Sequence, residues 1–502
     1  MALSEQQKNA VRHPVRWLFD TEPAGEGELP RAELTRFALG TIGQGQMTSM
    51  AGGWFFHFCT NVLELDPVVV GKMTGATTIL DALDDPVAGT IIDNHRFRDG
   101  RKLVPWIRLA APFSAVLSFL LFVSWPLSGT AAKVVCYTAI YLLWDVFFSF
   151  QSTSLMGMTA AISPHSAQRA RAVQWMEIGG LIGSLLPDLL LPTLSGNGVF
   201  GFTQKQIYFV FALVLCLGGG LLAMTSAGVT ERVRAIDGGG AKPNVLQSLG
   251  VLRHNHILLL FLAADVLRCA SPFLNEIFMF QQMTYRLGSK TIPAPVLVPV
   301  LSALAGLPGA SMKFIATKIA DRVGGMKRVL LIGCITDIAA RVMKFAIGVT
   351  SIPRLVLVYV VEALSELPWS IYGIAQRALI SDSVDYVEWK TGQRTEGITM
   401  AARGLTGKLA GGVRRMVTGY CLRFTQYSAE RVKLGLPQND HYRRWSWPVY
   451  QLGPALGAVM SLAPLLLLRY PDSLKNQVEA ELAQRREKAS HDAEDSAAER
   501  PG

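Results

Sequence analysis

Long, nearly uncharged apolar runs recur along the whole chain. Residues 110–127, 207–227 and 292–312 are three of them. A helix that crosses a bilayer needs about 20 mostly apolar residues, so each run is long enough to span one. Charged residues make up 17% of the 502 residues, where soluble domains carry roughly 25%. The pattern excludes a soluble enzyme, a disordered chain and a disulfide scaffold, and it predicts a polytopic membrane protein.

Merging the apolar runs at loop signals predicts an all-α membrane protein with twelve transmembrane helices in two pseudo-symmetric six-helix bundles. The predicted helices are 35–60, 67–92, 104–127, 132–161, 171–194, 205–229, 256–284, 293–319, 328–349, 353–380, 397–423 and 447–469. The longest polar stretch before the tail, 230–243, suits a linker between the halves. We therefore expect a tail over 1–33, bundles over 34–229 and 248–470, a linker over 230–247 and a second tail over 471–502.

Basic residues gather in the loops after the even-numbered predicted helices, such as Arg101 and Lys102 after the second and Arg232 after the sixth. Lys and Arg in short loops mark the cytoplasmic side of a membrane protein. Both termini are therefore expected in the cytoplasm, and the protein in a bacterial inner membrane. The basic loop 425–446 is an exception whose role stays open.

Two loops six helices apart share a pattern. Asp93, Gly100 and Arg101 follow the second predicted helix, and Asp321 and Arg328 flank a glycine turn after the eighth. An acid at a helix C-terminus opposes the helix dipole, so we expect each acid to pair with the basic residues that open the next helix. Such repeats suit a transporter built from two related halves. The pattern resembles the signature loop of the major facilitator superfamily, which implies conformational gating.

Acidic residues stand inside the second predicted helix. An ionisable side chain at the bilayer centre costs several kcal/mol, about 2.5–3.5 on insertion scales, so such residues mark pathways. Asp81 and Asp85 are i,i+4 and share one helix face, where two carboxylates bind Na⁺ or share a proton, and Asp84 adds a third acid. A cap at the helix end beside Pro86 is the alternative.

Asp145 lies among aromatic residues that include Tyr141 and Trp144. Aromatic faces and one carboxylate suit a sugar, whose C–H face stacks while its hydroxyls donate to the acid; a structural ion pair is the alternative. The second half is basic within its predicted helices, and many of these charges are expected to be interhelical pairs or snorkelling ends. Lys408, set among small residues, suits substrate binding or an acid of the other half.

These residues resemble the glycoside-pentoside-hexuronide:cation symporters, the group that includes bacterial melibiose permease. The likeness spans roughly 35–470, and three segments carry it: 81–102, 141–145 and 382–408. It implies that Asp81 and Asp85 are the coupling-cation carboxylates, that Asp145 binds sugar beside Tyr141, and that Lys408 lies near both sites. It also implies that 382–396 form a cytoplasmic loop that gates alternating access. The gating residues in that loop are Asp382, Asp385, Glu388, Arg394 and Glu396.

The chain departs from melibiose-type members at sugar contacts. The first predicted helix reads Gln44–Gly45 where those members place a Lys–Asp pair, and Glu177 stands near their basic residue of the fifth helix. Ser149 and Gly373 stand where they place tryptophans. The coupling machinery is thus better supported than the substrate, and a melibiose-like galactoside is not expected.

The sequence predicts a secondary active symporter that moves a sugar or glycoside with Na⁺ or H⁺ by alternating access. The basic second half favours an anionic, hexuronide-like substrate. A cation-coupled lysolipid or amphiphile transporter of the same superfamily and a non-transporting membrane sensor are the alternatives. No enzyme activity, cofactor or nucleic-acid partner is expected; the partners are the substrate, the cation and the bilayer. The substrate-binding candidates are Asp145, Tyr141, Lys408, Gln44, Trp144, Trp175, Trp369 and Tyr372.

Overall fold

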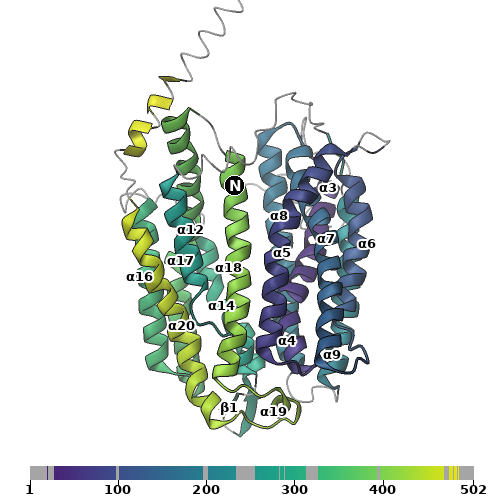
Figure 1. Ribbon diagram of the computed structural model, residues 1–502, viewed down its shortest axis with the longest axis vertical. Coiled ribbons are helices and arrows are strands. Elements are labelled where there is room, and N and C mark those ends of the chain that lie inside the picture. Colours follow the sequence, from purple (N-terminus) through teal and green to yellow (C-terminus); the bar gives the residue numbers. More distant parts are fainter. Residues whose placement is uncertain are drawn as a thin grey trace, which may run out of the picture.

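The computed structural model is built from two groups of helices that lie side by side (Figure 1). It describes residues 20, 28–95, 97, 101–195, 202–232, 255–281, 283–287, 289–312, 326–392, 396–468, 474–478, 480–482, 484 and 485. The chain enters its first helix and ends its last helical residues at the upper end in Figure 1, which we call the terminal end. The opposite end, where α19 and β1 lie, is called the far end.

The first half forms six helical segments. They are α3 (Arg31–Thr48) continued by a π-helical stretch (Ser49–Trp54) and α4 (Phe55–Asn61), then α5 (Pro67–Asn94), α6 (Val104–Leu120), α7 (Thr130–Ala161), α8 (Ser166–Ser195), and α9 (Gln204–Ala212) continued by η3 (Leu213–Leu217) and α10 (Gly218–Thr225). Caps account for several starts: Asp66 accepts from the Val68 amide before α5, and Thr203 and Gln206 form a capping box before α9.

The second half forms six more principal helices. They are α12 (His256–Cys269), α14 (Ala294–Met312), α16 (Met326–Ile347), α17 (Ile352–Thr391), α18 (Glu396–Phe424) and α20 (Asp440–Leu467). Shorter elements are α13 (Glu276–Phe280), the antiparallel pair β1 (Thr284–Leu287) and β2 (Lys290–Pro293), and α19 (Ala429–Lys433). The twelve-helix, all-α prediction is confirmed, although the predicted helix 256–284 is wrong beyond Cys269, because Pro272 disfavours helix and the chain turns into α13 and a hairpin.

The predicted gating loop 382–396 is also wrong in large part. α17 runs unbroken through Thr391, so Asp382, Asp385 and Glu388 lie on a helix. The residues from 382 to 390 contain no proline or glycine, and the helix ends where Gly392 takes the left-handed conformation at φ 71°. The break between α17 and α18 is therefore confined to 392–395.

The cores of the halves are joined at the far end and separate at the terminal end. One buried cluster contains Phe56 and Phe58 of the first half together with Phe278 and Leu422 of the second. At the terminal end, a cluster around Ile107 belongs to the first half alone, and a second one belongs to α12, α16, α17 and the helical residues after 473. Apolar contact thus holds the halves together at the far end.

The outward faces of both halves expose apolar side chains such as Val135, Leu221, Leu307 and Leu364. Large exposed apolar surfaces on a well-packed protein mark contact with lipid or a partner. Five described helical ranges are long and apolar enough by themselves to cross a membrane: Thr130–Ala161, Gln168–Leu194, Gln204–Gly228, Ile352–Gly373 and Asp440–Leu467. Charged residues interrupt several of the other described helices, such as α5, α16 and α18.

Polar contacts secure the terminal end of the first half. The Glu231 carboxylate accepts from the amides of Lys102, Leu103 and Val104 and so caps α6, at 2.7–2.9 Å. Arg232 pairs with Glu33 at 2.7 Å. The predicted linker beyond these residues, 233–247, lies outside the described part of the chain.

Candidate cation and substrate site

A lysine from the second half joins two acids of the first half. Lys408 Nζ on α18 lies 2.5 Å from Asp81 Oδ1 and 2.6 Å from Asp85 Oδ2 on α5. It also donates to the Asp81 carbonyl oxygen at 2.9 Å. The ammonium thus uses all three of its N–H donors on one turn of α5.

Small residues let α5 and α18 approach closely enough for this contact. A Cβ added at Gly75 would lie 2.8 Å from the Gly412 carbonyl oxygen, and one added at Gly412 would lie 2.8 Å from that of Gly75. Backbones in such contact leave no room for a side chain, so glycine is required on both helices. Gly412 is one turn beyond Lys408, and the packing fixes the height at which the lysine meets the acids.

Two further acids extend the group. Carboxylate oxygens of Asp81, Asp84 and Asp145 all lie within 4.8 Å of one another. Asp145, on α7, is 5% exposed and makes no hydrogen bond or ion pair with any residue that the structure describes. Asp84 Oδ1 is buried and also has no such partner. Four carboxylates therefore share one ammonium, and like charges this close repel strongly unless a cation or protons join them.

Ser149 stands where melibiose-type members place a tryptophan, and the structure gives it a contact in this site. Its hydroxyl donates to Asp85 Oδ1 at 3.0 Å and so links α7 to the acid that Lys408 binds. Since Ser149 and Asp145 are i,i+4 on α7, the same helix face carries the unpaired acid and a ligand of the paired one. The serine ties the two parts of the site together.

The aromatic residues beside Asp145 are buried, and one of them packs against α4. Tyr141 is buried, stacks on Phe55 with ring centroids 5.5 Å apart, and receives Arg415 Nη1 at 3.5 Å. Trp144 is buried as well, and its indole N–H has no partner among the described residues. Like Asp145, it presents a buried polar atom whose hydrogen bond is still to be supplied.

A cavity of about 410 Å³ lies between α3, α7 and α8. Gln44, Thr48, Ser152, Glu177 and Ser184 give it a polar lining. On α7, Ser152 is two helical turns from Asp145 in the direction of the terminal end, so the cavity lies on the route from that end to the acids. Gly45 stands where melibiose-type members have the acid of their Lys–Asp pair. A Cβ added at Gly45 would lie 2.7 Å from the Gly180 carbonyl oxygen, so a side chain has no room there.

The structure does not bring the remaining aromatic candidates to this group. Trp175 packs against the first half's own cluster at the terminal end. Trp369 and Tyr372 belong to the second half, where their rings stack 4.7 Å apart and the Arg268 guanidinium lies 4.3 Å from the Trp369 centroid. The faces of the Trp369 ring are thus engaged by protein groups.

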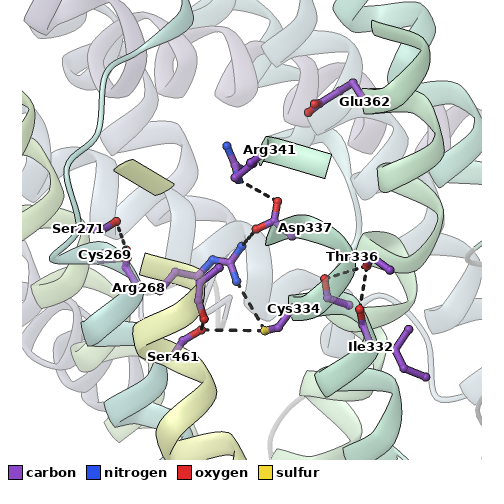
Figure 2. A network of polar contacts seen from close by, with 12 residues as sticks. Arg268, Cys269, Ser271, Ile332, Cys334, Thr336, Asp337, Arg341, Glu362 and Ser461 are labelled. Atoms are coloured by element: carbon purple, nitrogen blue, oxygen red, sulfur yellow. Dashed lines mark hydrogen bonds and ion pairs between the residues drawn. The ribbon is translucent and has the colours of Figure 1, made fainter. Parts of the chain in front are cut away.

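A group of charged side chains near Trp369 is paired within the second half. Asp337 accepts from Arg268 at 2.5 Å and from Arg341 at 2.9 Å, and Figure 2 shows the two arginines reaching it from different sides. Arg268 also approaches the Cys334 sulfur, which lies 4.0 Å from the Ser461 hydroxyl. Lys344 pairs with Glu362. These contacts join α12, α16, α17 and α20 into one body.

The sequence matches the family described as MFS/sugar transport protein over residues 36–470. The chain belongs to this family. An isoprimeverose transporter of Lactiplantibacillus pentosus is 23% identical over 97% of this chain and 98% of its own length. A lactose permease of Lactobacillus helveticus is 25% identical over 76% of this chain and 61% of its own length, so the chain spans less than two thirds of that relative. A putative 2,3-dihydroxypropane-1-sulfonate exporter of Salmonella typhimurium is 26% identical over 74% of this chain and 78% of its own length.

Solved structures agree on the fold. A nucleoside transporter superposes with a TM-score of 0.56 at 12% identity, covering 87% of this chain and 99% of that one. A D-xylose–proton symporter does so with a TM-score of 0.54 at 13% identity, covering 85% and 96%. The major facilitator fold predicted from the sequence is confirmed, and this chain is a transporter-family membrane protein.

The predicted gating residues that the structure describes lie toward the terminal end of this MFS protein. Asp382 of α17 pairs with Lys475 at 3.0 Å, and Arg328 opens α16. Asp385, Glu388 and Arg101 lie in the described part of the chain and have interaction partners. Gly100, Asp321 and Arg394 lie outside the described residues; Asp93 and Glu396 lie at helix ends, and nothing is described of their side chains.

Sequence reasoning missed a polar network at the far end. His57 and Asn61 of α4 meet Gln281, the residue after α13, with the Asn61 amide 3.0 Å from Gln281 Oε1. Tyr427, beyond α18, donates to the same oxygen at 2.8 Å, and Tyr208 lies 2.5 Å from His57 Nδ1. The available signal was a pair of polar residues, His57 and Asn61, spaced i,i+4 in an apolar helix. Their partners lie between 151 and 366 residues away in the sequence.

Proposed function

We propose that this MFS protein is a secondary active symporter that carries a sugar or glycoside together with Na⁺ or H⁺. The observation that carries the proposal is the group of four carboxylates served by one lysine from the other half. Oxygen ligands suit hard cations, and a carboxylate pair also holds a proton. The isoprimeverose and lactose carriers among its relatives support a sugar as the cargo.

The site couples cation binding to movement of the halves because Lys408 and the cation compete. Without a coupling ion, the ammonium neutralises Asp81 and Asp85 and holds α18 against α5. Na⁺ or H⁺ on these acids weakens that hold and leaves the interface free to rearrange. By thermodynamic linkage, any substrate that favours the rearranged state raises cation affinity by the same factor.

Substrate reaches the site from the terminal end. The apolar cluster shared by both halves and the network around Gln281 close the far end, while the polar cavity beside Gln44 lies toward the terminal end. Basic loops favour the cytoplasm for that end, so this conformation faces inward, in a bacterial inner membrane. Asp145 accepts from sugar hydroxyls, and Tyr141 and Trp144 line the same place.

The deciding experiment is uptake into right-side-out vesicles. A panel of labelled neutral and anionic glycosides and one lysolipid is offered with and without an imposed Na⁺ or H⁺ gradient. Gradient-driven accumulation of a glycoside supports the proposal and identifies the cation. If only the lysolipid is transported, the proposed cargo becomes an amphiphile instead of a sugar. If no compound is transported, the result favours a non-transporting membrane sensor.

A single substitution links the flux to the site. We expect Asp85→Asn to abolish gradient-driven accumulation while leaving folded protein, because the neutral amide carries no charge for a cation to neutralise and takes up no proton. Asp440→Asn is the matched control, since this acid is fully exposed at the start of α20. Unchanged accumulation in Asp85→Asn would overturn the assignment of the cation site.

A further inference from the structure

One arginine between the halves has no carboxylate partner among the described residues. Arg415 lies on α18 two turns beyond Lys408 and crosses to the first half. Its Nη2 donates to the Gly52 carbonyl oxygen at 3.2 Å, and its Nη1 lies 3.5 Å from the Tyr141 hydroxyl. Both partners are neutral. A guanidinium has five N–H donors, so donors remain for an acceptor that the described chain does not supply.

Arg415 faces an irregular stretch of the first helical segment. Gly52 belongs to the π-helical stretch Ser49–Trp54, and π-helical insertions in α-helices occur frequently at functional sites. The Gly52 carbonyl oxygen of this stretch accepts from the guanidinium. Two helices of the first half thus position one cation of the second.

The cation without a carboxylate partner and the acid without a partner among the described residues both lie near Tyr141. Tyr141, which Arg415 approaches, precedes Asp145 by one turn of α7. Asp145 is 5% exposed and has no partner among the described residues, so it needs donors, whereas Arg415 needs an acceptor. A molecule that offers hydroxyls at one end and a negative group at the other satisfies both.

We propose that Arg415 recognises an anionic group on the substrate, so that the cargo is a polyhydroxylated organic anion such as a sugar acid. This rests on the proposed function as a symporter. Hydroxyls of the cargo donate hydrogen bonds to Asp145. The carboxylate or sulfonate of the cargo accepts hydrogen bonds from the Arg415 guanidinium. Arginine is suited to this because its planar fork matches two oxygens at once. The sulfonate exporter among the relatives supports an anion of this chemistry.

An anionic cargo also tightens the coupling. The four nearby carboxylates repel a negative group, and the repulsion falls when Na⁺ or H⁺ has joined them. The coupling cation must therefore bind before or with the cargo. Affinity for the anionic cargo then rises more steeply with cation concentration than affinity for a neutral analogue.

The neighbouring arginine provides a matched control. Arg414 points into the second half, where it contacts the Cys269 sulfur at 3.4 Å and lies 4.8 Å from the Phe273 ring centroid. Arg414→Gln lowers the charge of α18 by one unit, as Arg415→Gln does, but at the adjacent position. Its substitution leaves the groups around Tyr141 in place.

The test compares pairs of compounds that differ only in charge, bound to the purified full chain in lipid nanodiscs. The pairs are methyl glucuronide with methyl glucoside, methyl galacturonide with methyl galactoside, and 2,3-dihydroxypropane-1-sulfonate with glycerol. Affinities are measured for the unchanged chain, Arg415→Gln, Arg415→Lys and Arg414→Gln. The carboxylate and sulfonate pairs distinguish the two sources of negative charge.

We expect one anionic member to bind more tightly than its neutral partner. Arg415→Gln should lower its affinity roughly 10- to 100-fold, the size of a charge-assisted hydrogen-bonded pair, and leave the neutral partner unchanged. Arg415→Lys should lose less, and Arg414→Gln should match the unchanged chain. A neutral member that binds at least as well, or a ratio that Arg415→Gln does not alter, overturns the inference while symport stands. If no pair binds, and no glycoside is accumulated in the vesicle experiment above, the proposed function fails as well.

Discussion

The charged side chains around Asp337 are paired within the second half, whereas Asp81 and Asp85 of the first half depend on a lysine from the other half. Asp337 holds two arginines across α12 and α16, and each member of this group has its counter-charge. Four acids of the first half share Lys408, and Asp145 has no partner among the described residues. Charges that are satisfied within one body stabilise it. Charges that are satisfied only across the moving interface make its arrangement depend on what is bound.

Removing the central acid of the second half should have the largest effect on stability. Asp337→Asn removes the carboxylate that the partly buried Arg268 and Arg341 share, which should cost about 3 kcal/mol, the lower end of the range for a broken buried pair. We expect a large drop in the thermal unfolding midpoint in detergent and a low yield of folded protein. Asp440→Asn serves as the exposed control. A midpoint equal to that of the unchanged chain would show that this group is not structural.

The same change in the first half should remove binding and spare the fold. Asp145→Asn takes away a carboxylate that no described residue compensates, so repulsion falls and stability holds or rises. Loss of a charged acceptor for two sugar hydroxyls should weaken substrate binding by on the order of 100-fold. Parallel measurements of unfolding and of substrate binding check both parts. A clearly lower unfolding midpoint would place Asp145 in a structural role.

Replacing Lys408 tests whether the interface responds to cations. Lys408→Met leaves Asp81 and Asp85 unneutralised, which should cost about 2 kcal/mol in a buffer that contains only a bulky organic cation. Na⁺ or a lower pH should restore the lost stability, because either one supplies the missing positive charge. Unfolding midpoints across a cation series provide the measurement. Equal loss in every buffer would mean that the lysine contributes packing alone.

The glycine contact beneath the lysine should give a smaller effect. Gly75→Val places carbon atoms against the Gly412 carbonyl oxygen and should cost about 1–2 kcal/mol by forcing α5 from α18. Gly89→Val lies on the same helix, where an added Cβ meets nothing within 4 Å, and it is the matched control. If both variants have the same thermal unfolding midpoint as the unchanged chain, stability does not require the close approach of these helices.

The smallest effect is expected where the helical residues after 473 rest on α17. Hydrogen bonds from the Gln477 amide and the Trp389 indole lower the pKa of the exposed Glu481 carboxyl. A lowered pKa in the docked state stabilises docking above the ordinary value of 4.5, and this contribution is lost as the pH falls through the docked-state pKa. Trp389 fluorescence should therefore change on acidification, and Glu481→Gln should abolish that change. A transition that persists in Glu481→Gln would belong to another group.

The sequence predicts what depends on neighbours in the chain. Apolar runs of bilayer length establish the twelve helices, and the i,i+4 spacing of Asp81 and Asp85 places both on one face, where a single lysine reaches them. The continuation of α17 through Thr391 was missed because a cluster of charges looks like a loop although each residue tolerates helix. The π-helical stretch is equally invisible, since its sequence is compatible with an ordinary helix.

The sequence does not reveal which side chains meet when they lie far apart in the chain. Trp369 and Tyr372 carry the residue types of a sugar site, but long-range packing places them against Arg268. Arg415 appears in the sequence as one of several membrane cations, and only the fold shows that it faces Tyr141 while Arg414 faces Cys269. Partner choice over hundreds of residues is a property of helix packing, which a single sequence does not encode in its spacing.

The network around Gln281 determines how readily the far end of the transporter can open. Its oxygen receives Asn61 from the first half and Tyr427 from the second half, so the closed state is held by hydrogen bonds rather than by apolar contact alone. When such bonds break, water takes over their donors and acceptors, and the net cost is only about 0.5–1.5 kcal/mol per bond. A closure of this kind is specific in geometry yet inexpensive to undo. It allows many cycles of turnover without a large barrier at this step.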